Sequence, residues 1–127
     1  MESQVKVALD TNMLLAAEQF KISLVEEIES KLSKAEIVIP SQVITELEKL
    51  AGKSKKLEKQ VKIAMQIIKN EGVKQIEVKA SNADKALLTL AKQGFIIATN
   101  DKELRKKVKK SFGKCLILRK KKYLTLE

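Results

Sequence analysis

The sequence predicts an α/β protein, a three-layer sandwich around a central, mainly parallel sheet of five strands. Short apolar runs alternate with amphipathic helical segments along the chain, which favours parallel strands joined by helices. The 127 residues suit one compact domain, and 44% hydrophobic residues are enough to fill one core. We therefore expect residues 1–127 to form a single domain.

The first apolar run, residues 5–9, predicts a buried strand that ends at Asp10. A helical segment is expected from Asn12, and further apolar residues at helical spacing follow it. A second short apolar run, residues 36–39, predicts a second strand, which Pro40 closes.

Two helices and a more exposed strand are expected next. Ser41 can cap the first helix, and Gly52 can end it. A lysine-rich turn leads to a longer helix, which Gly72 stops. Residues 73–78 mix apolar and polar side chains, so they predict a third strand with one exposed face.

The last third of the chain repeats the pattern. Ser81 is expected to open a helix that Gly94 closes, and residues 95–98 predict a fully apolar fourth strand. A basic helix follows, and its inward-facing side chains are expected to be Leu104, Val108 and Phe112. Residues 115–118 predict a fifth strand, with Cys115 in the core and a basic tail after it.

The apolarity of the strands predicts their order in the sheet. The first strand is expected at the centre, with the second and third on one side and the fourth and fifth on the other, in the order 3-2-1-4-5. The topological switch then lies beside the first and fourth strands, where open α/β sheets bind ligands. Asp10 and Asp101 follow these two strands. We therefore expect their carboxylates to meet in one crevice.

The charge balance favours a polyanionic partner. Lys and Arg number 26 against 16 Asp and Glu, a net charge of +10, which favours nucleic acid before an anionic membrane. With no apolar span, signal peptide or lipidation motif, we expect no membrane partner and a cytoplasmic location. Because there is no histidine and one cysteine, zinc bound by Cys and His, an internal disulfide and histidine-dependent nucleophiles are excluded. Carboxylates are the main candidates for chemistry.

Glu46 and Asp84 can join Asp10 and Asp101 in a site, although each acid also has a local explanation. Glu46 lies on the flank of its helix, where it can border a crevice or pair with Lys49. Asp84 also lies on a helix flank, but it fits a capping box as the third helical residue. Asp10 and Asp101 can cap the helices that follow them.

Four fragments carry a family resemblance, and they are Asp10-Thr11-Asn12, Thr45-Glu46-Leu47-Glu48 after Pro40, Asn82-Ala83-Asp84-Lys85-Ala86-Leu87 and Thr99-Asn100-Asp101-Lys102-Glu103-Leu104. In this order and spacing the chain resembles the PIN-domain nucleases over essentially its whole length. It is most similar to the small-subunit rRNA-processing PIN endonucleases and their archaeal relatives. The closer match rests on Glu18-Gln19-Phe20-Lys21, Glu46-Leu47-Glu48-Lys49-Leu50, Ala98-Thr99-Asn100-Asp101 and Lys121-Lys122-Tyr123.

The resemblance implies a metal-dependent endoribonuclease that processes an rRNA precursor. It implies that Mg²⁺ or Mn²⁺ is held by Asp10, Glu46, Asp84 and Asp101, with support from Asn12 and Thr99. Toxin-type PIN ribonucleases share the acids, so a toxin of a toxin–antitoxin pair stays open. A homodimer, a ribosome-assembly factor and a protein inhibitor stay open as partners.

The chemistry of the residues agrees with that expectation. Clustered carboxylates repel one another and need a compensating cation, and hard oxygen ligands suit Mg²⁺ or Mn²⁺. Such ions activate water and stabilise charge in phosphoryl displacement. Candidate RNA-binding residues are Lys53, Lys55, Lys56, Arg105, Lys106 and Lys109. Because aromatic residues are few, and Phe95 and Phe112 are expected in the core, we expect recognition through phosphates rather than base stacking.

Two other classes of function stay open at this point. A phosphotransferase could use Asp10 as its nucleophile, but dehalogenase-type phosphatases have a second Asp where this chain has Asn12. A non-catalytic RNA-binding assembly module could retain the acids for structural reasons.

Overall fold

A six-stranded sheet forms the centre of the computed structural model, which describes residues 4–127. The strands are β1 (Lys6–Leu9), β2 (Glu36–Pro40), β3 (Lys74–Ile76), β4 (Ile96–Ala98), β5 (Cys115–Arg119) and β6 (Tyr123–Leu126). They lie in the order β3-β2-β1-β4-β5-β6, and every neighbouring pair from β3 to β5 is parallel. The α/β class and the predicted order of the first five strands are confirmed.

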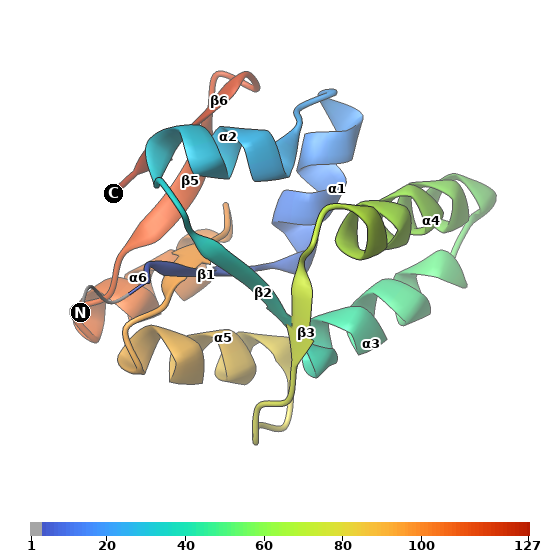
Figure 1. Ribbon diagram of the computed structural model, residues 1–127. Coiled ribbons are helices and arrows are strands. Elements are labelled where there is room, and N and C mark those ends of the chain that lie inside the picture. Colours follow the sequence, from blue (N-terminus) through green and yellow to red (C-terminus); the bar gives the residue numbers. More distant parts are fainter. Residues whose placement is uncertain (1–3) are drawn as a thin grey trace.

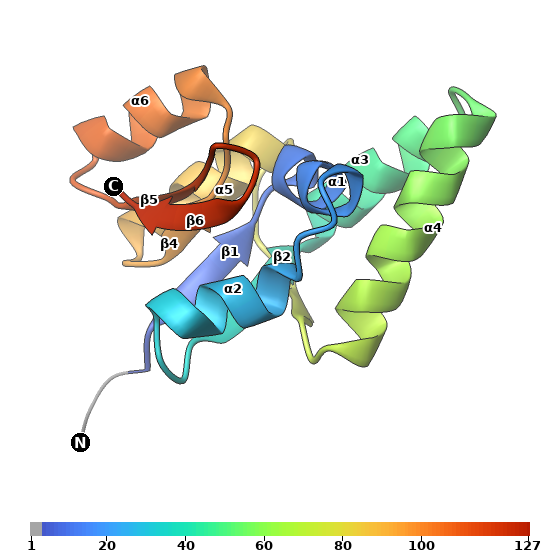
Figure 2. The ribbon, with the colours of Figure 1, turned by 90° about the horizontal axis from the view of Figure 1, so that it is seen from above.

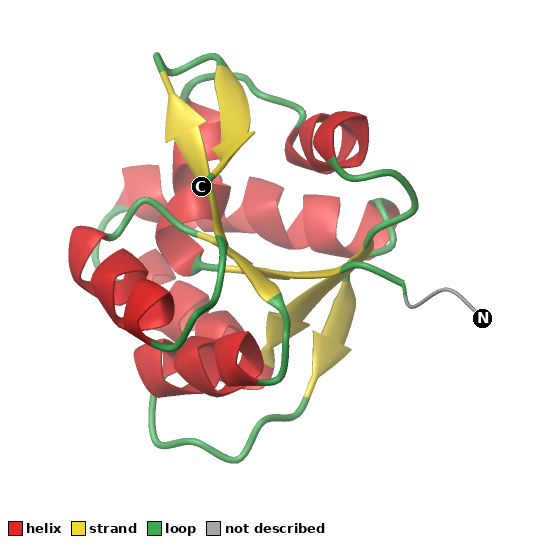
Figure 3. Ribbon diagram, turned by 90° about the vertical axis from the view of Figure 1, so that its left-hand side faces the viewer, coloured by secondary structure: helices red, strands yellow, loops and turns green. Residues whose placement is uncertain are grey.

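Helices cover the sheet. Those among residues 4–127 are α1 (Thr11–Gln19), α2 (Leu24–Lys31), α3 (Ser41–Ala51), α4 (Lys55–Asn70), α5 (Ala83–Lys92) and α6 (Lys102–Lys110). Figure 1 shows α1 and α2 above the sheet and α5 below it, and Figure 3 shows the strands passing between helices. As predicted, α4 and α5 end just before Gly72 and Gly94, whose φ angles are 73° and 96°. No helix within residues 4–127 is long and apolar enough to cross a membrane.

The apolar core follows the central strands. Val7, Ala8 and Leu9 of β1 are completely buried, because helices cover both faces of a parallel sheet. Cys115 at the start of β5 is also completely buried, as predicted, and burial raises the pKa of its thiol.

The predicted sheet of five strands is wrong by one strand, because the chain after the basic residues that follow β5 turns back as β6 instead of ending as a tail. This strand pairs antiparallel with β5, and the buried Leu124 anchors it in the core. The Leu124 N–H donates to Glu27 Oε1 at 3.0 Å, which ties β6 to α2. The turn before β6 places Lys120 and Lys121 at φ angles of 53° and 56°, where Gly or Asn is usual. The sequence therefore lacks the usual hairpin signal.

Phe112 was wrongly expected in the core. It is 97% exposed, and its φ of 62° is left-handed, because α6 has already ended. The next residue, Gly113, packs so closely that a Cβ there would lie 2.8 Å from Val108 Cγ1. Glycine therefore fits at this position without displacing Val108. Phe95 is half-buried rather than fully buried, and Lys6 Nζ lies 5.4 Å from its ring centroid.

Two predicted helix caps are also wrong. The Ser41 hydroxyl does not cap α3 but donates to Glu77 Oε2 at 2.9 Å. Asn82, rather than Ser81, caps α5, and its Oδ1 accepts a hydrogen bond from the Lys85 N–H at 2.9 Å.

Candidate active site at the carboxyl edge of the sheet

Asp10 lies at the carboxyl end of the central strand, beside the end of β4. Its N–H donates to Ala98 O at 3.1 Å, and its side chain is almost completely buried. Its Oδ1 accepts a hydrogen bond from the Thr11 N–H at 2.8 Å, so Asp10 caps α1. Its Oδ2 accepts one from the Thr99 hydroxyl at 2.6 Å. The Asp10 carboxylate therefore caps α1 and also lies at the carboxyl edge of the sheet, where open α/β sheets bind ligands.

Thr99 links Asp10 to Asp101. The Thr99 hydroxyl is completely buried; it donates to Asp10 and accepts a hydrogen bond from the Asp101 N–H at 3.1 Å. Asp101 Oδ1 caps α6 by accepting from the N–H groups of Glu103 (2.9 Å) and Leu104 (3.2 Å). The two acids thus lie at one edge of the sheet and are joined through Thr99. Asp101 also caps α6, so its predicted local role is present as well.

Burial dominates the electrostatics of Asp10. It raises the pKa of this carboxyl from 3.8 to about 6, because removing a charge from water is costly. The hydrogen bonds from Thr99 and Thr11 oppose the rise, and the negative charges of Asp84 and Glu46 add to it. Asp84 and Glu46 therefore act on the same region as Asp10.

A hydrogen-bonded loop places α5 beside α3. The Gln42 amide of α3 donates to Ala80 O at 2.9 Å and also to Val78 O, which holds the segment before α5. Sequence reasoning missed Gln42, since a polar residue in a first helical turn gives no distinctive signal. A depression of about 330 Å³ lies at this junction, lined by Gln42, Thr45, Glu46, Lys49, Ser81, Asn82 and Ala83.

Within the described residues, Glu46 does not form the predicted helix ion pair and Asp84 does not form the predicted capping box. Within residues 4–127, neither side chain takes part in an ion pair, so the Glu46–Lys49 pair does not form. Asp84 is the second residue of α5 and does not complete a capping box. Both side chains are exposed, as is Asn12.

The donor set at this edge suits a hard cation, although the acids do not converge into a complete site. Within the described part of the chain, no three acidic side chains are close enough together to hold an ion. The four predicted ligands offer only carboxylate oxygens, the ligand type that Mg²⁺ and Mn²⁺ prefer. A buried carboxylate with a raised pKa, acted on by two further negative charges, is a place where a cation would relieve repulsion.

The predicted RNA-binding residues fall on two sides of this edge. Lys53 precedes α4 and Lys55 and Lys56 begin it, and all three are exposed. On the other side, α6 borders a depression of about 280 Å³ lined by Lys102, Arg105, Lys106 and Lys109. Figure 2 shows α4 and α6 on opposite sides of the molecule, with the end of β1 between them.

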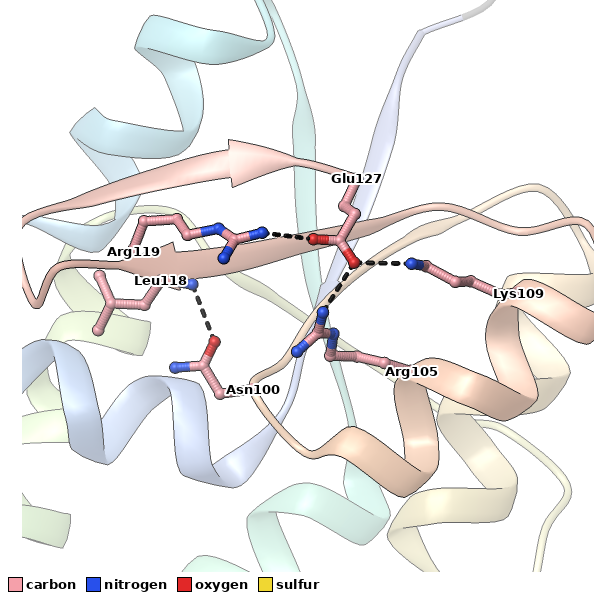
Figure 4. Close-up of polar contacts among 6 residues, drawn as sticks. All are labelled: Asn100, Arg105, Lys109, Leu118, Arg119 and Glu127. Carbon is pink, nitrogen blue, oxygen red and sulfur yellow. Dashed lines mark hydrogen bonds and ion pairs between the residues drawn. The ribbon is translucent and has the colours of Figure 1, made fainter.

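Glu127 is a further polar residue that sequence reasoning missed. Its carboxylate accepts hydrogen bonds from Arg105, Lys109 and Arg119 (Figure 4). Lys109 first, and then Arg105, lower its pKa to about 2. Figure 4 also shows Asn100 Oδ1, which accepts a hydrogen bond from the Leu118 N–H at 2.9 Å and ties the segment before α6 to β5.

Comparisons with known proteins agree with this architecture. A family model described as a PIN like domain matches residues 7–121. The chain is 38% identical over 126 residues to Ribonuclease VapC4 of Methanocaldococcus jannaschii, an alignment that covers 95% of each protein.

Two solved structures are also similar. The PIN domain endonuclease Utp24 matches with a TM-score of 0.80 and 26% identity, over 96% of this chain and 90% of that one. A domain of a functionally unknown protein from Methanocaldococcus jannaschii matches with a TM-score of 0.62 over 91% of each chain, and at 20% identity it shares the fold alone. The expected resemblance to PIN-domain nucleases is confirmed, and the chain belongs to the PIN-like domain family.

Proposed function

We propose that this protein is a metal-dependent endoribonuclease that hydrolyses RNA phosphodiester bonds at the carboxyl edge of β1 and β4. The observation that carries the proposal is the buried carboxylate of Asp10, which is linked through Thr99 to Asp101. The negative charges of Asp84 and Glu46 raise the pKa of this carboxyl. A relative that is 38% identical over nearly the whole chain is a ribonuclease by name.

Asp10, Glu46, Asp84 and Asp101 would hold Mg²⁺ or Mn²⁺. When bound, such an ion supplies a nucleophilic water at neutral pH and stabilises charge on the phosphoryl group. The protein's own contribution is positional. Thr99 and the Thr11 N–H fix both oxygens of Asp10, so this carboxylate keeps one orientation.

The remaining predicted residues act on the substrate or support the acids. Asn12 is exposed in the first turn of α1, two residues after Asp10. The exposed lysines of α4 and the basic face of α6 flank the site, so an RNA strand could cross the edge of the sheet with phosphates held on both sides.

Two biological roles compete for this activity in the cytoplasm, where we place the protein. Processing of an rRNA precursor is the role that the sequence resemblance implies, and it would involve a ribosome-assembly factor as partner. The structural similarity to the PIN domain endonuclease Utp24 supports endonuclease activity. A toxin-type role stays open because toxin-type PIN ribonucleases share the acids, and it would involve a protein inhibitor. The sequence similarity to Ribonuclease VapC4 supports ribonuclease activity in either role. Cleavage of purified precursor rRNA at one position, against scattered cleavage and arrested growth on expression, separates the two roles.

The activity itself is tested with Asp10→Asn, which keeps the shape of the side chain and removes one negative charge. Wild type and variant are compared on structured RNA in Mn²⁺, in Mg²⁺ and in EDTA. Cleavage by wild type should require the ion. The cleavage rate of the variant should be lower by orders of magnitude, while the variant should still bind RNA.

Three outcomes would contradict the proposal. Equal cleavage by both proteins, or cleavage that persists in EDTA, would indicate a different site or a contaminant. RNA binding without cleavage by wild type on varied substrates would favour a non-catalytic assembly module.

A further inference from the structure

Three cationic side chains surround the Glu127 carboxylate (Figure 4). Arg105 Nη2 and Lys109 Nζ both lie 2.7 Å from Oε1, and Arg119 Nη2 lies 2.9 Å from Oε2. Three positive charges thus meet one negative charge, so the cluster keeps a positive surplus. Convergent guanidinium and ammonium groups of this kind are the usual donors to phosphate oxygens.

The cluster adjoins the candidate active site. Arg105 lies one helical turn beyond Asp101, and its N–H donates to Asp101 O at 2.9 Å. Arg119 follows Leu118, whose N–H is held by Asn100 next to Asp101. A chain with regularly spaced negative charges could therefore reach the cluster and the acids together.

Two of the three cations of the cluster are open to solvent. The side chains of Lys109 and Arg119 are 50% and 53% exposed, whereas those of Arg105 and Glu127 are each 23% exposed. Arg105 and Lys109 also line the depression on α6, together with Lys102 and Lys106. The buried Arg105 Nε has no hydrogen-bond partner within residues 4–127, so the donors of this guanidinium are not all satisfied by Glu127.

We propose that Arg105, Lys109 and Arg119 form a binding site for an RNA phosphate, and that the Glu127 carboxylate occupies this site in the free protein and is displaced when RNA binds. The identity of the ligand rests on the proposed function. Exchange of one anion for another leaves the three cations in contact with a negative group in both states, although their positive surplus remains in the free protein. It also means that every RNA has to compete with an internal anion.

The test measures RNA binding in EDTA, where cleavage does not interfere. Glu127→Gln removes the competing charge at the cluster. Glu103→Gln is the matched control, because it removes the same charge from an exposed residue of α6 that lies 3.9 Å from Lys106. Glu127→Asp keeps the net charge and withdraws the carboxylate by one methylene.

We expect Glu127→Gln to bind single-stranded RNA several-fold more tightly than wild type and than Glu103→Gln. If one more phosphate is engaged, the slope of log K against log salt should become steeper by about 0.7. Glu127→Asp should shift affinity in the same direction by less. Adding Arg119→Gln to Glu127→Gln should remove much of the gain.

Equal affinities for Glu127→Gln and Glu103→Gln would overturn the proposal, since only net charge would then matter. Weaker binding by folded Glu127→Gln would make Glu127 a structural clasp that orients the cations. Thermal unfolding shows whether each variant is folded, and if Glu127→Gln is not, Glu127→Asp decides the question. Because the readout is binding in EDTA, these outcomes do not depend on whether the protein cleaves RNA.

Discussion

Asp10 binds its proton more tightly in the folded protein than in the unfolded chain, because burial raises its pKa from 3.8 to about 6. For an acid with a raised pKa, the contribution to folding stability is greatest below the unfolded value and is lost as the pH rises through the folded value. A rise of this size corresponds to about 3 kcal/mol at most. In the absence of a cation, Asp10 therefore destabilises the fold at neutral pH.

Asp10→Asn should remove this pH dependence. In EDTA, the free energy of unfolding of the variant relative to wild type should increase by up to about 3 kcal/mol between pH 4 and pH 7. Urea unfolding at several pH values measures the difference. Asp84→Asn is the control, because this exposed acid should change the profile far less. Parallel stability profiles for wild type and Asp10→Asn would contradict the burial argument.

At the scale of single elements, the end of α6 contains a residue in an unfavourable conformation. The backbone of Phe112 is in the left-handed conformation, and its side chain is almost fully exposed. The side chain therefore makes few contacts that could offset the backbone strain. Phe112→Gly should raise the stability by about 1 kcal/mol, whereas Phe112→Ala should not. Gly113→Ala should destabilise the protein, because its Cβ would meet Val108. Chemical denaturation measures all three, and a destabilised Phe112→Gly would show that the ring has a packing role.

The hairpin of β5 and β6 makes a second prediction at this scale. Leu124→Ala should destabilise the protein by about 2–4 kcal/mol, because its side chain is completely buried. The control Leu126→Ala, two residues along the same strand and 43% exposed, should cost less than about 1 kcal/mol. Equal costs would mean that β6 does not pair in this register.

What the sequence could predict differs between these elements. The spacing of the apolar residues was sufficient to predict five strands and their order in the sheet. The order could be predicted because a central parallel strand has to be apolar on both faces. They failed at β6, where two lysines adopt the left-handed turn conformation that glycine usually supplies. They failed at Phe112, because helical spacing continues in the sequence after the helix has ended.

At the scale of the whole molecule, the basic surface should make RNA binding strongly dependent on salt. If about five phosphates are contacted, the slope of log K against log salt should be roughly −3.5 for single strands. Replacing Lys53, Lys55 and Lys56 together by Gln, or Arg105, Lys106 and Lys109 together, should weaken binding and flatten the slope. The control replaces Lys34, Lys69 and Lys74, exposed lysines next to the amino ends of β2 and β3. A nearly flat dependence in wild type would contradict recognition through phosphates.

The sequence predicted the positions of two of the four candidate ligands better than those of the other two. Asp10 and Asp101 were placed at one edge because each follows an apolar strand, and the structure joins them through Thr99. The approach of Glu46 and Asp84 depends on the angle between α3 and α5, which the amide of Gln42 helps to fix. That angle is a property of tertiary packing and leaves no periodic signal in the sequence.

The bond between Asp10 and Thr99 joins residues 89 positions apart. At a synthesis rate of about 5–20 residues per second, Asp10 therefore leaves the ribosome roughly 5 to 20 seconds before its partner. During that interval the nascent chain can pair β1 with β2, but the edge that carries the acids is incomplete. The long loop closure that the central strand requires thus delays assembly of the site until most of the chain has been made.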